Sequence, residues 1–371
     1  MVDRTINNNI EDNITSENID DKIIIGLAGN PNTGKSTLFN HLTGLKQHTG
    51  NWPGKTVANA KGYFSYNEND YMLVDLPGTY SLFINSQEEE ISRDFICFGN
   101  PKITLVLVDG TSLERNLNLV LQIMEATDNV IMCINLMDEV EKKGISIDID
   151  KLEDFLNIPV IPIIAREGIG INVLLQTIDK IVNNELKINP NKTIYDNTIE
   201  STIAEIEKIL KNSLDEVYNL RWIGLRLIDG DLNMKMQIKN ILLKTGNINT
   251  LIQIDNIINK YNNLGEKIVT TLYEKAEIIA NEVIYINNTN NRNWDKIIDD
   301  ILTNRLIGYP IMLLLLGGIF WITIIGSNYP SEMLSRLFFT MEPKLSEAFL
   351  RLNPPIWLHG MLIFGVYRTL A

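Results

Sequence analysis

A glycine-rich stretch near the start of the chain constrains the fold more than any other feature of the sequence. Residues 29–36 read Gly-Asn-Pro-Asn-Thr-Gly-Lys-Ser and follow the apolar run 22–28. The pattern G-x-x-x-x-G-K-S between a strand and a helix surrounds the phosphates of a nucleotide with backbone N–H groups. Lys35 would contact the β- and γ-phosphates, and the Ser36 hydroxyl would bind Mg²⁺. The sequence therefore predicts a nucleoside triphosphate site.

Two further boxes, each after a predicted strand, indicate which nucleotide is bound. Residues 135–138 read Asn-Leu-Met-Asp, and the Asp138 carboxylate suits guanine because it accepts from both N1–H and the exocyclic amine, a donor pair that adenine lacks. Residues 75–78 read Asp-Leu-Pro-Gly. Asp75 would hold Mg²⁺ through water, and Gly78 would offer an N–H near the γ-phosphate. Three boxes in this order predict a GTPase.

The remaining loops of such a site are also recognisable. Thr56 lies between the first predicted helix and the next strand, and its hydroxyl would complete the Mg²⁺ shell only while a γ-phosphate is present. A further box, Ile164-Ala165-Arg166 after the strand 160–163, is expected to contact the base through a backbone N–H. Ile164 stands where a serine is more usual, so altered nucleotide exchange is expected. Thr79 follows the second box in place of the glutamine that orients water in Ras-like proteins, and water must be positioned by another group.

These motifs resemble those of FeoB-type ferrous iron transporters of prokaryotic inner membranes. The resemblance rests on three stretches, and it extends through the segment 221–227 to 304–310, so that it covers nearly the whole chain from about residue 22. The three stretches are 29–36, the Gly-Asn-Trp-Pro-Gly phrase of 50–54, and 75–82. The second is the most specific, because generic GTPase chemistry does not require a tryptophan there.

The resemblance implies a slow, K⁺-activated GTPase that drives or gates Fe²⁺ uptake. In this reading Asn32 supplies a side-chain oxygen to K⁺, and the loop around Gly50 and Trp52 adds backbone carbonyls. A monovalent cation beside the phosphates stabilises developing charge as an arginine finger does. Lys55 departs from the small apolar residue expected before Thr56. Its ammonium is either solvated or close enough to the phosphates to weaken the dependence on K⁺.

The predicted site thus has catalytic, nucleotide-binding and cation-binding members. The catalytic residues are Asn32, Lys35 and Gly78. The guanine nucleotide, GTP or GDP, is assigned to Gly29, Asn30, Pro31, Asn32, Thr33, Gly34, Lys35, Ser36, Thr37, Gly54, Lys55, Thr56, Asp75, Leu76, Pro77, Gly78, Asn135, Leu136, Met137, Asp138, Ala165 and Arg166. Mg²⁺ is assigned to Ser36, Thr56 and, through water, Asp75, and K⁺ to Asn32, Gly50 and Trp52.

Hydrophobic patterning divides the chain into domains. Residues 1–20 are polar and lack an apolar signal region, which predicts a disordered leader. Residues 21–186 alternate β-rich runs with amphipathic stretches, the pattern of a Ras-like, mixed but mainly parallel α/β sheet. Residues 190–288 carry apolar residues at helical spacing, which predicts an all-α bundle. In the resembling family this bundle tunes nucleotide binding and relays the switch state to the membrane part.

The remaining residues have the character of a membrane segment. Residues 289–305 are interpreted as a linker and amphipathic helix, and 306–329, which lack Asp, Glu, Lys and Arg, as a transmembrane helix. Residues 330–371 are interpreted as an external segment and the start of a second apolar segment, cut off before a permeation domain. The inner membrane, the rest of the permease, FeoA- or FeoC-like accessory proteins and an oligomer are the expected partners.

Composition weighs against other classes of function. Lys+Arg 33 against Asp+Glu 46 gives a formal net charge of −13, which disfavours nucleic acid as a partner. A ribosome- or tRNA-associated GTPase would need a basic RNA-binding appendage, and a membrane-remodelling GTPase a longer stalk. The isolated Cys97 and Cys133 are expected in the core. Glu274 and Glu277 lie one turn apart and are either a conceivable Fe²⁺ site or, more simply, a solvated helix face.

Overall fold

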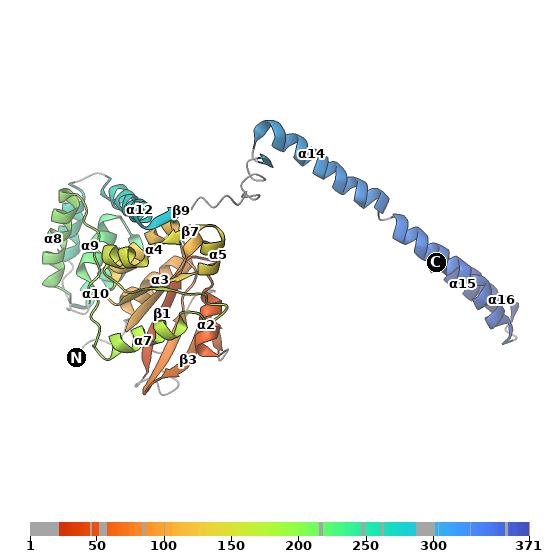
Figure 1. The fold of residues 1–371 in the computed structure, drawn as a ribbon, viewed down its shortest axis with the longest axis horizontal. Coiled ribbons are helices and arrows are strands. Elements are labelled where there is room, and N and C mark those ends of the chain that lie inside the picture. The colour runs from red at the N-terminus through yellow and green to blue at the C-terminus, as the bar shows by residue number, and fades with distance from the viewer. Residues whose placement is uncertain are drawn as a thin grey trace. The chain divides into compact units, whose positions relative to one another are not determined.

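The structure of the chain is a computed structural model. It describes residues 22–44, 47–51, 58–83, 86–99, 101–214, 218–245, 249–260, 263–286, 301–302, 304–326, 328–352 and 355–370. These belong to two compact units, Met1–Asn288 and Thr289–Ala371, both drawn in Figure 1. The predicted leader and most of the predicted linker lie outside the described residues.

A seven-stranded sheet in the order β2-β3-β4-β1-β5-β6-β8 forms the first part of the chain. Five strands are parallel to one another, while β2 and β3 add an antiparallel hairpin at one edge. The predicted mixed, mainly parallel sheet is confirmed. The strands are β1 (Ile23–Gly29), β2 (Gln47–Asn51), β3 (Ala58–Tyr66), β4 (Asn69–Asp75), β5 (Ile103–Asp109), β6 (Val130–Asn135) and β8 (Val160–Pro162).

The register of the parallel strands gathers the sequence boxes at one edge of the sheet. Leu27 pairs with Asp75, and Asp109 pairs with Asn135. The carboxyl ends of β1, β4 and β6, where the three boxes begin, therefore lie together. In open α/β sheets this edge is where ligands bind.

Helices cover both faces of the sheet because β-strand side chains alternate between faces. Ile25 and Leu27 pack in one cluster with Leu38 and Leu174, whereas Ala28 faces a second cluster that includes Leu117. The helices of this part are α2 (Lys35–Thr43), α3 (Gln87–Phe98), α4 (Leu113–Ala126), α5 (Met137–Lys142), α6 (Ile149–Leu156) and α7 (Ile171–Val182), with a short 3₁₀ turn η1 (Gly110–Ser112).

The second core cluster continues without a break into the predicted all-α bundle, which is confirmed. Ile199, Ile206 and Ile268 belong to the same buried cluster as Leu117 of α4. Helix α4 lies between the sheet and the bundle, and all but two of its residues are buried. The bundle helices, grouped beside the sheet in Figure 1, are α8 (Asn197–Lys211), α9 (Leu220–Ile228), α10 (Leu232–Thr245), α11 (Asn249–Ile258) and α12 (Leu264–Val283).

One short strand was not expected within the bundle. Helix α12 runs into β9 (Ile284–Ile286), which pairs antiparallel with β7 (Ile145–Ile147) of the sheet domain. Ile147 pairs with Ile284, and both side chains pack against the core. A three-residue apolar segment has no helical or strand period of its own, so tertiary pairing decides its conformation.

The second unit contains the apolar helices. By length and composition, one helical stretch among the described residues, within Ile307–Leu350, is long and apolar enough to cross a membrane, and an 18-residue window of it has a mean hydropathy of 2.1. A second apolar helical run packs against it, with Tyr367 donating to Phe338 O at 2.8 Å. The elements are α14 (Arg305–Trp321), η2 (Ile322–Gly326, a π-helix), α15 (Asn328–Leu350), α16 (Ile356–His359), η3 (Gly360–Tyr367, a π-helix) and α17 (Arg368–Leu370).

Candidate nucleotide-binding site

The glycine-rich stretch forms a tight loop from the end of β1 to the first turn of α2. Asn32 and Gly34 have left-handed backbone angles, φ 66° and 92°. Thr33 Oγ1 donates to Asn30 O at 2.9 Å and closes the loop. The loop thus turns backbone N–H groups toward the pocket at a helix N-terminus, where anions are favoured. The pocket is lined by Asn32, Gly34, Lys35, Ser36, Thr37, Ala60, Asp75, Leu76, Pro77 and Gly78.

Lys35 and Asp75 lie within this pocket. Lys35 Nζ donates to Gly29 O at 3.1 Å, and Asp75 Oδ1 is buried without a hydrogen-bond partner in the described part of the chain. Burial lowers the pKa of Lys35, an effect that Asp75 opposes. Burial raises the pKa of Asp75 to about 6, and Lys35 opposes that shift. The pocket therefore disfavours both charges until further charged groups enter it.

These residues fit a phosphate chain with a divalent cation. An orphaned carboxylate oxygen and the Ser36 hydroxyl are hard oxygen ligands of the kind Mg²⁺ selects, directly or through water. Gly78 lies next to the Lys35 ammonium, since a Cβ at residue 78 would be 2.8 Å from Lys35 Nζ. A side chain at residue 78 would therefore fill the space next to Lys35 where a phosphate would bind.

Asn135 of the base-recognition box joins three loops. Its side chain is buried, its Nδ2 donates to Thr33 O at 2.8 Å, and its Oδ1 accepts from Ala165 N at 3.0 Å. Leu136 follows with φ 62°, which starts α5 at Met137. The structure thus gives Asn135 the role of holding the loops together, and it leaves Asp138 as the group available to a base.

The Asp138 carboxylate faces two cations. Arg166 Nη2 lies 3.4 Å from its Oδ2, and Lys142 Nζ lies 3.5 Å from the same oxygen. Both contacts are long, and the Arg166 side chain is 72% exposed, so a ligand can replace them at little cost.

The loop with the unusual Ile164 is closed by its own backbone. Ile164 N donates to Ile169 O at 3.1 Å, and Glu167 N donates to Ile164 O at 3.0 Å. Gly168 and Gly170 supply the left-handed turns at φ 75° and 83°. Because main-chain bonds shape this loop, a serine hydroxyl at position 164 is not needed to form it.

Some predicted residues fall outside the described part of the chain. These are Trp52, Gly54, Lys55 and Thr56, so their assignments to nucleotide, Mg²⁺ and K⁺ stay predictions. Gly50 lies in β2, paired with Asn59 of β3. Glu274 and Glu277 are exposed on α12, and the described residues contain no group of three or more His, Cys, Asp or Glu side chains arranged to hold a metal.

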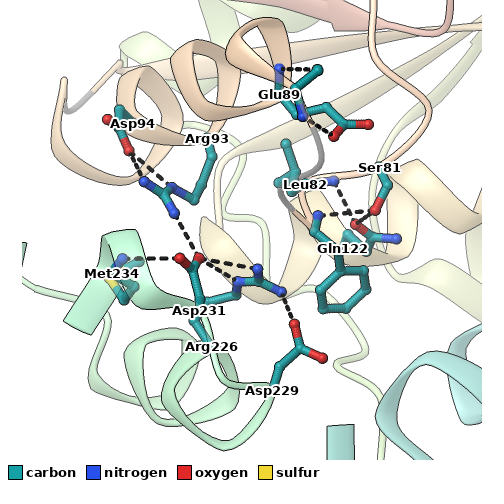
Figure 2. A network of polar contacts seen from close by, with 12 residues as sticks. Ser81, Leu82, Glu89, Arg93, Asp94, Gln122, Arg226, Asp229, Asp231 and Met234 are labelled. Carbon is teal, nitrogen blue, oxygen red and sulfur yellow. Dashed lines mark hydrogen bonds and ion pairs between the residues drawn. The ribbon is translucent and has the colours of Figure 1, made fainter. Parts of the chain in front are cut away.

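Sequence reasoning missed a network of polar contacts with buried members, shown in Figure 2. Arg93 of α3 donates to Asp231 at 2.6 Å, and Arg226 of α9 donates to the same oxygen at 3.0 Å. Gln122 of α4 accepts from Ser81 and Leu82. One signal in the sequence could have identified them: a charged or amide side chain at a core-facing position of an apolar helix. Such groups are buried only when they are paired, so each of them predicts a polar partner nearby.

This loop-and-strand arrangement defines a P-loop nucleotide-binding domain of the GTPase fold, joined to a helical domain. A model of the family described as Ferrous iron transport protein B matches residues 23–178, and a model of the FeoB cytosolic helical domain matches residues 195–285. The chain belongs to the FeoB family.

Individual relatives support this assignment. The Fe(2+) transporter FeoB of Shigella flexneri is 40% identical over 215 residues, which cover 57% of this chain and 27% of that protein. That of Salmonella typhimurium is 32% identical over 309 residues, 82% of this chain and 39% of that protein. The chain thus spans well under half the length of these curated relatives.

Solved structures extend the likeness to three dimensions. The cytosolic domain of L. pneumophila FeoB is 33% identical with a TM-score of 0.61, over 71% of this chain and 99% of that one. The cytosolic domain of T. maritima FeoB in its GMPPNP form is 32% identical with a TM-score of 0.57, over 71% and 99%. An S. thermophilus FeoB domain bound to GDP has 29% identity and a TM-score of 0.61, over 71% and 100%.

Proposed function

We propose that this chain binds and hydrolyses GTP as the regulatory part of a ferrous iron transporter of the cytoplasmic membrane. The observation that carries the proposal is the meeting of Lys35, the unpartnered Asp75 oxygen and Gly78 in one pocket at the N-terminus of α2. Relatives that contain the same two domains are described as bound to GDP or in a GMPPNP form.

The residues divide the work of binding. Backbone N–H groups of residues 32–36 and the Lys35 ammonium bind the phosphates, while Asp138 accepts from the guanine edge. Ala165 N is already engaged by Asn135, so the loop reaches the base in a fixed position. The Gly78 N–H then meets the γ-phosphate, which only the triphosphate carries.

Two cations complete the proposed site. Ser36, Thr56 and, through water, Asp75 would hold Mg²⁺, and Asn32 with the carbonyls of Gly50 and Trp52 would hold K⁺. Their positive charge stabilises the charge that develops on the phosphates during hydrolysis. Asn32 is exposed at the loop, with its backbone in the left-handed region, so its side chain is free to reach a cation there.

The switch state has a structural path to the helical domain. Helix α3 follows the segment after Gly78, and its Arg93 shares the Asp231 carboxylate with Arg226 (Figure 2). A shift of α3 on loss of the γ-phosphate must therefore move or break these buried ion pairs. We infer that the helical domain passes this change to the membrane part, where it gates or drives Fe²⁺ passage together with the rest of a permease, in an oligomer and with FeoA- or FeoC-like accessory proteins.

The deciding experiment is the GTPase rate of the whole chain in detergent micelles, in KCl against NaCl at equal ionic strength. We expect a clear rise in K⁺, lost in Asn32→Ala with nucleotide affinity retained. Asn67→Ala is the matched control, because Asn67 is also exposed with a left-handed φ of 51° but bonds Asp179, away from the pocket.

Different outcomes test the enzymatic function, the K⁺ site and the base assignment one by one. A parent chain that hydrolyses no GTP contradicts the enzymatic function. Equal rates in the two salts contradict only the K⁺ site, and a rate lost equally in both asparagine variants would indicate damage to the fold. Asp138→Asn should abolish the preference for GTP over ATP, and an unchanged preference would refute the base assignment.

A further inference from the structure

The segment that follows Gly78 is fixed to α4 by one buried amide. Gln122 Oε1 accepts from Leu82 N at 2.7 Å and from Ser81 Oγ at 2.9 Å. Ser81 Oγ in turn accepts from Phe83 N at 2.9 Å. Gln122 has no exposed surface, and Figure 2 shows its side chain pointing into this turn. Three consecutive residues therefore depend on a single side chain 40 residues away.

The same segment is also fixed at its other end, by β1 and by α3. Leu76 N donates to Leu27 O at 3.0 Å, Thr79 N donates to Gly29 O at 3.3 Å, and Ser92 Oγ donates to Pro77 O at 3.2 Å. Gly78 lies within this first set of bonds, and of the three only the Thr79 N–Gly29 O bond, the longest at 3.3 Å, follows it in the chain. Gln122 then fixes the far end of the segment at Ser81 and Leu82.

We propose that Gln122 is a positioning residue for GTP hydrolysis, which holds the Gly78 N–H at the place of the γ-phosphate. This inference rests on the proposed GTPase function. With Leu82 fixed, the backbone from residue 79 to residue 82 limits how far Gly78 can leave the pocket when the long Thr79 N–Gly29 O bond opens. Without the amide, the segment loses one end, and a displacement of about 1 Å at a reacting group lowers rates by up to about 10²-fold.

The chemistry of the anchor predicts which substitutions preserve it. Only the oxygen of Gln122 is used, because its buried Nε2 has no partner in the described part of the chain. Gln122→Glu keeps an acceptor of the same shape for both donors, whereas Gln122→Leu removes it and leaves the Leu82 N–H unsatisfied.

Asn118 provides a matched control one turn earlier on the same helix. It is also buried, and its Oδ1 has no partner among the described residues. Asn118→Leu therefore makes the same kind of amide-to-leucine change in α4 without releasing the segment.

The experiment measures kcat and KM for GTP, and the affinities for GDP and GMPPNP, in the whole chain in detergent micelles. For Gln122→Leu we expect kcat to fall about tenfold or more, with KM and GDP affinity within about twofold of the parent. The ratio of GMPPNP to GDP affinity should fall at least about threefold, because the γ-phosphate loses its N–H partner. Gln122→Glu should recover most of kcat and most of the ratio of GMPPNP to GDP affinity, and Asn118→Leu should resemble the parent.

Ser81→Ala serves if Gln122→Leu does not fold. It removes one of the two donors and keeps the Leu82 bond, so a smaller fall of kcat in the same direction is expected. An unchanged kcat in Gln122→Leu overturns the inference, as does a loss of GDP affinity by the same factor as kcat, which would indicate a purely structural role. If the parent hydrolyses no GTP, the proposed function fails and the GMPPNP-to-GDP ratio alone decides the role of Gln122.

Discussion

Two of the polar junctions between the helical domain and the sheet domain, beside their shared apolar core at α4, differ in burial. At the first, between α3 and the α9–α10 turn, the Arg93, Arg226 and Asp231 side chains are 0%, 2% and 3% exposed. At the second, where β9 pairs with β7, the Lys151 and Glu282 side chains are 36% and 55% exposed. The ion pairs of the first junction are therefore buried, whereas that of the second is exposed to solvent.

The difference concerns how strongly each junction couples the domains. Removing one partner of a buried pair leaves an uncompensated charge and costs several kcal/mol, whereas an exposed pair contributes little. The first junction involves α3, the helix that follows the segment after Gly78. A movement of α3 would therefore disturb buried ion pairs, whose loss lowers stability strongly. The second junction contains β9, the last strand before the apolar helices in the chain. It is held mainly by backbone hydrogen bonds, namely the pairing of β9 with β7 and the bond from Asp148 N to Val283 O at 2.9 Å.

The largest effect is expected at Asp231, whose Oδ2 accepts from two arginines and whose Oδ1 accepts from Met234 N. Asp231→Ala should lower the free energy of unfolding by about 3–5 kcal/mol, because two buried guanidinium groups each lose one of their two acidic partners, Arg93 keeping Asp94 and Arg226 keeping Asp229. Urea denaturation followed by circular dichroism measures this. The control is Asp255→Ala in the same domain, which removes an exposed partner of Lys235 and should cost at most about 1 kcal/mol. Equal costs would remove the contrast between buried and exposed pairs.

A smaller effect is expected when the charge at residue 93 is kept and its geometry is changed. Arg93 bonds Asp94 through Nε and Nη2 and Asp231 through Nη1. Arg93→Lys cannot make these bonds together, so we expect a loss of about 1–3 kcal/mol in unfolding free energy. Asp94 and Asp231 keep a positive neighbour in this variant, which separates hydrogen-bond geometry from net charge. A lysine variant as stable as the parent would show that charge alone holds this junction.

The smallest effect is expected at the exposed junction. Lys151 Nζ lies 2.6 Å from Glu282 Oε2, and a double-mutant cycle with Lys151→Ala and Glu282→Ala should give a coupling free energy far smaller than that between Arg93 and Asp231. The coupling should weaken further in high salt, because solvent-exposed charges are screened. A coupling as large as that at the first junction, or one insensitive to salt, would contradict the picture of a junction held by its backbone.

The parts of the site that sequence predicted are those with local signatures. The P-loop, Asp75–Gly78 and Asn135–Asp138 can each be identified from a few consecutive residues, because each follows a predicted strand directly in the chain. The structure places these boxes at one edge of the sheet, as the parallel register requires. The assignments of Thr56 and of the K⁺ site stay predictions, since most of that loop lies outside the described residues.

The residues that sequence reasoning missed act over long separations. Arg93 and Asp231 are 138 positions apart, and Ser81 and Gln122 are 41 positions apart. The apolar pattern of α4 indicates a buried helix, but it does not show which polar group a buried amide such as Gln122 contacts. The strand β9 was missed for a related reason, because three residues, Ile-Tyr-Ile, become a strand only through their pairing with β7.

Asn135 has one more consequence. Because a single carboxamide ties β6 to Thr33 O and Ala165 N, bonds within the protein itself join the phosphate loop to the two base loops. Part of the order that a bound nucleotide needs is thus built into the chain, so less of the binding free energy is required to order these loops.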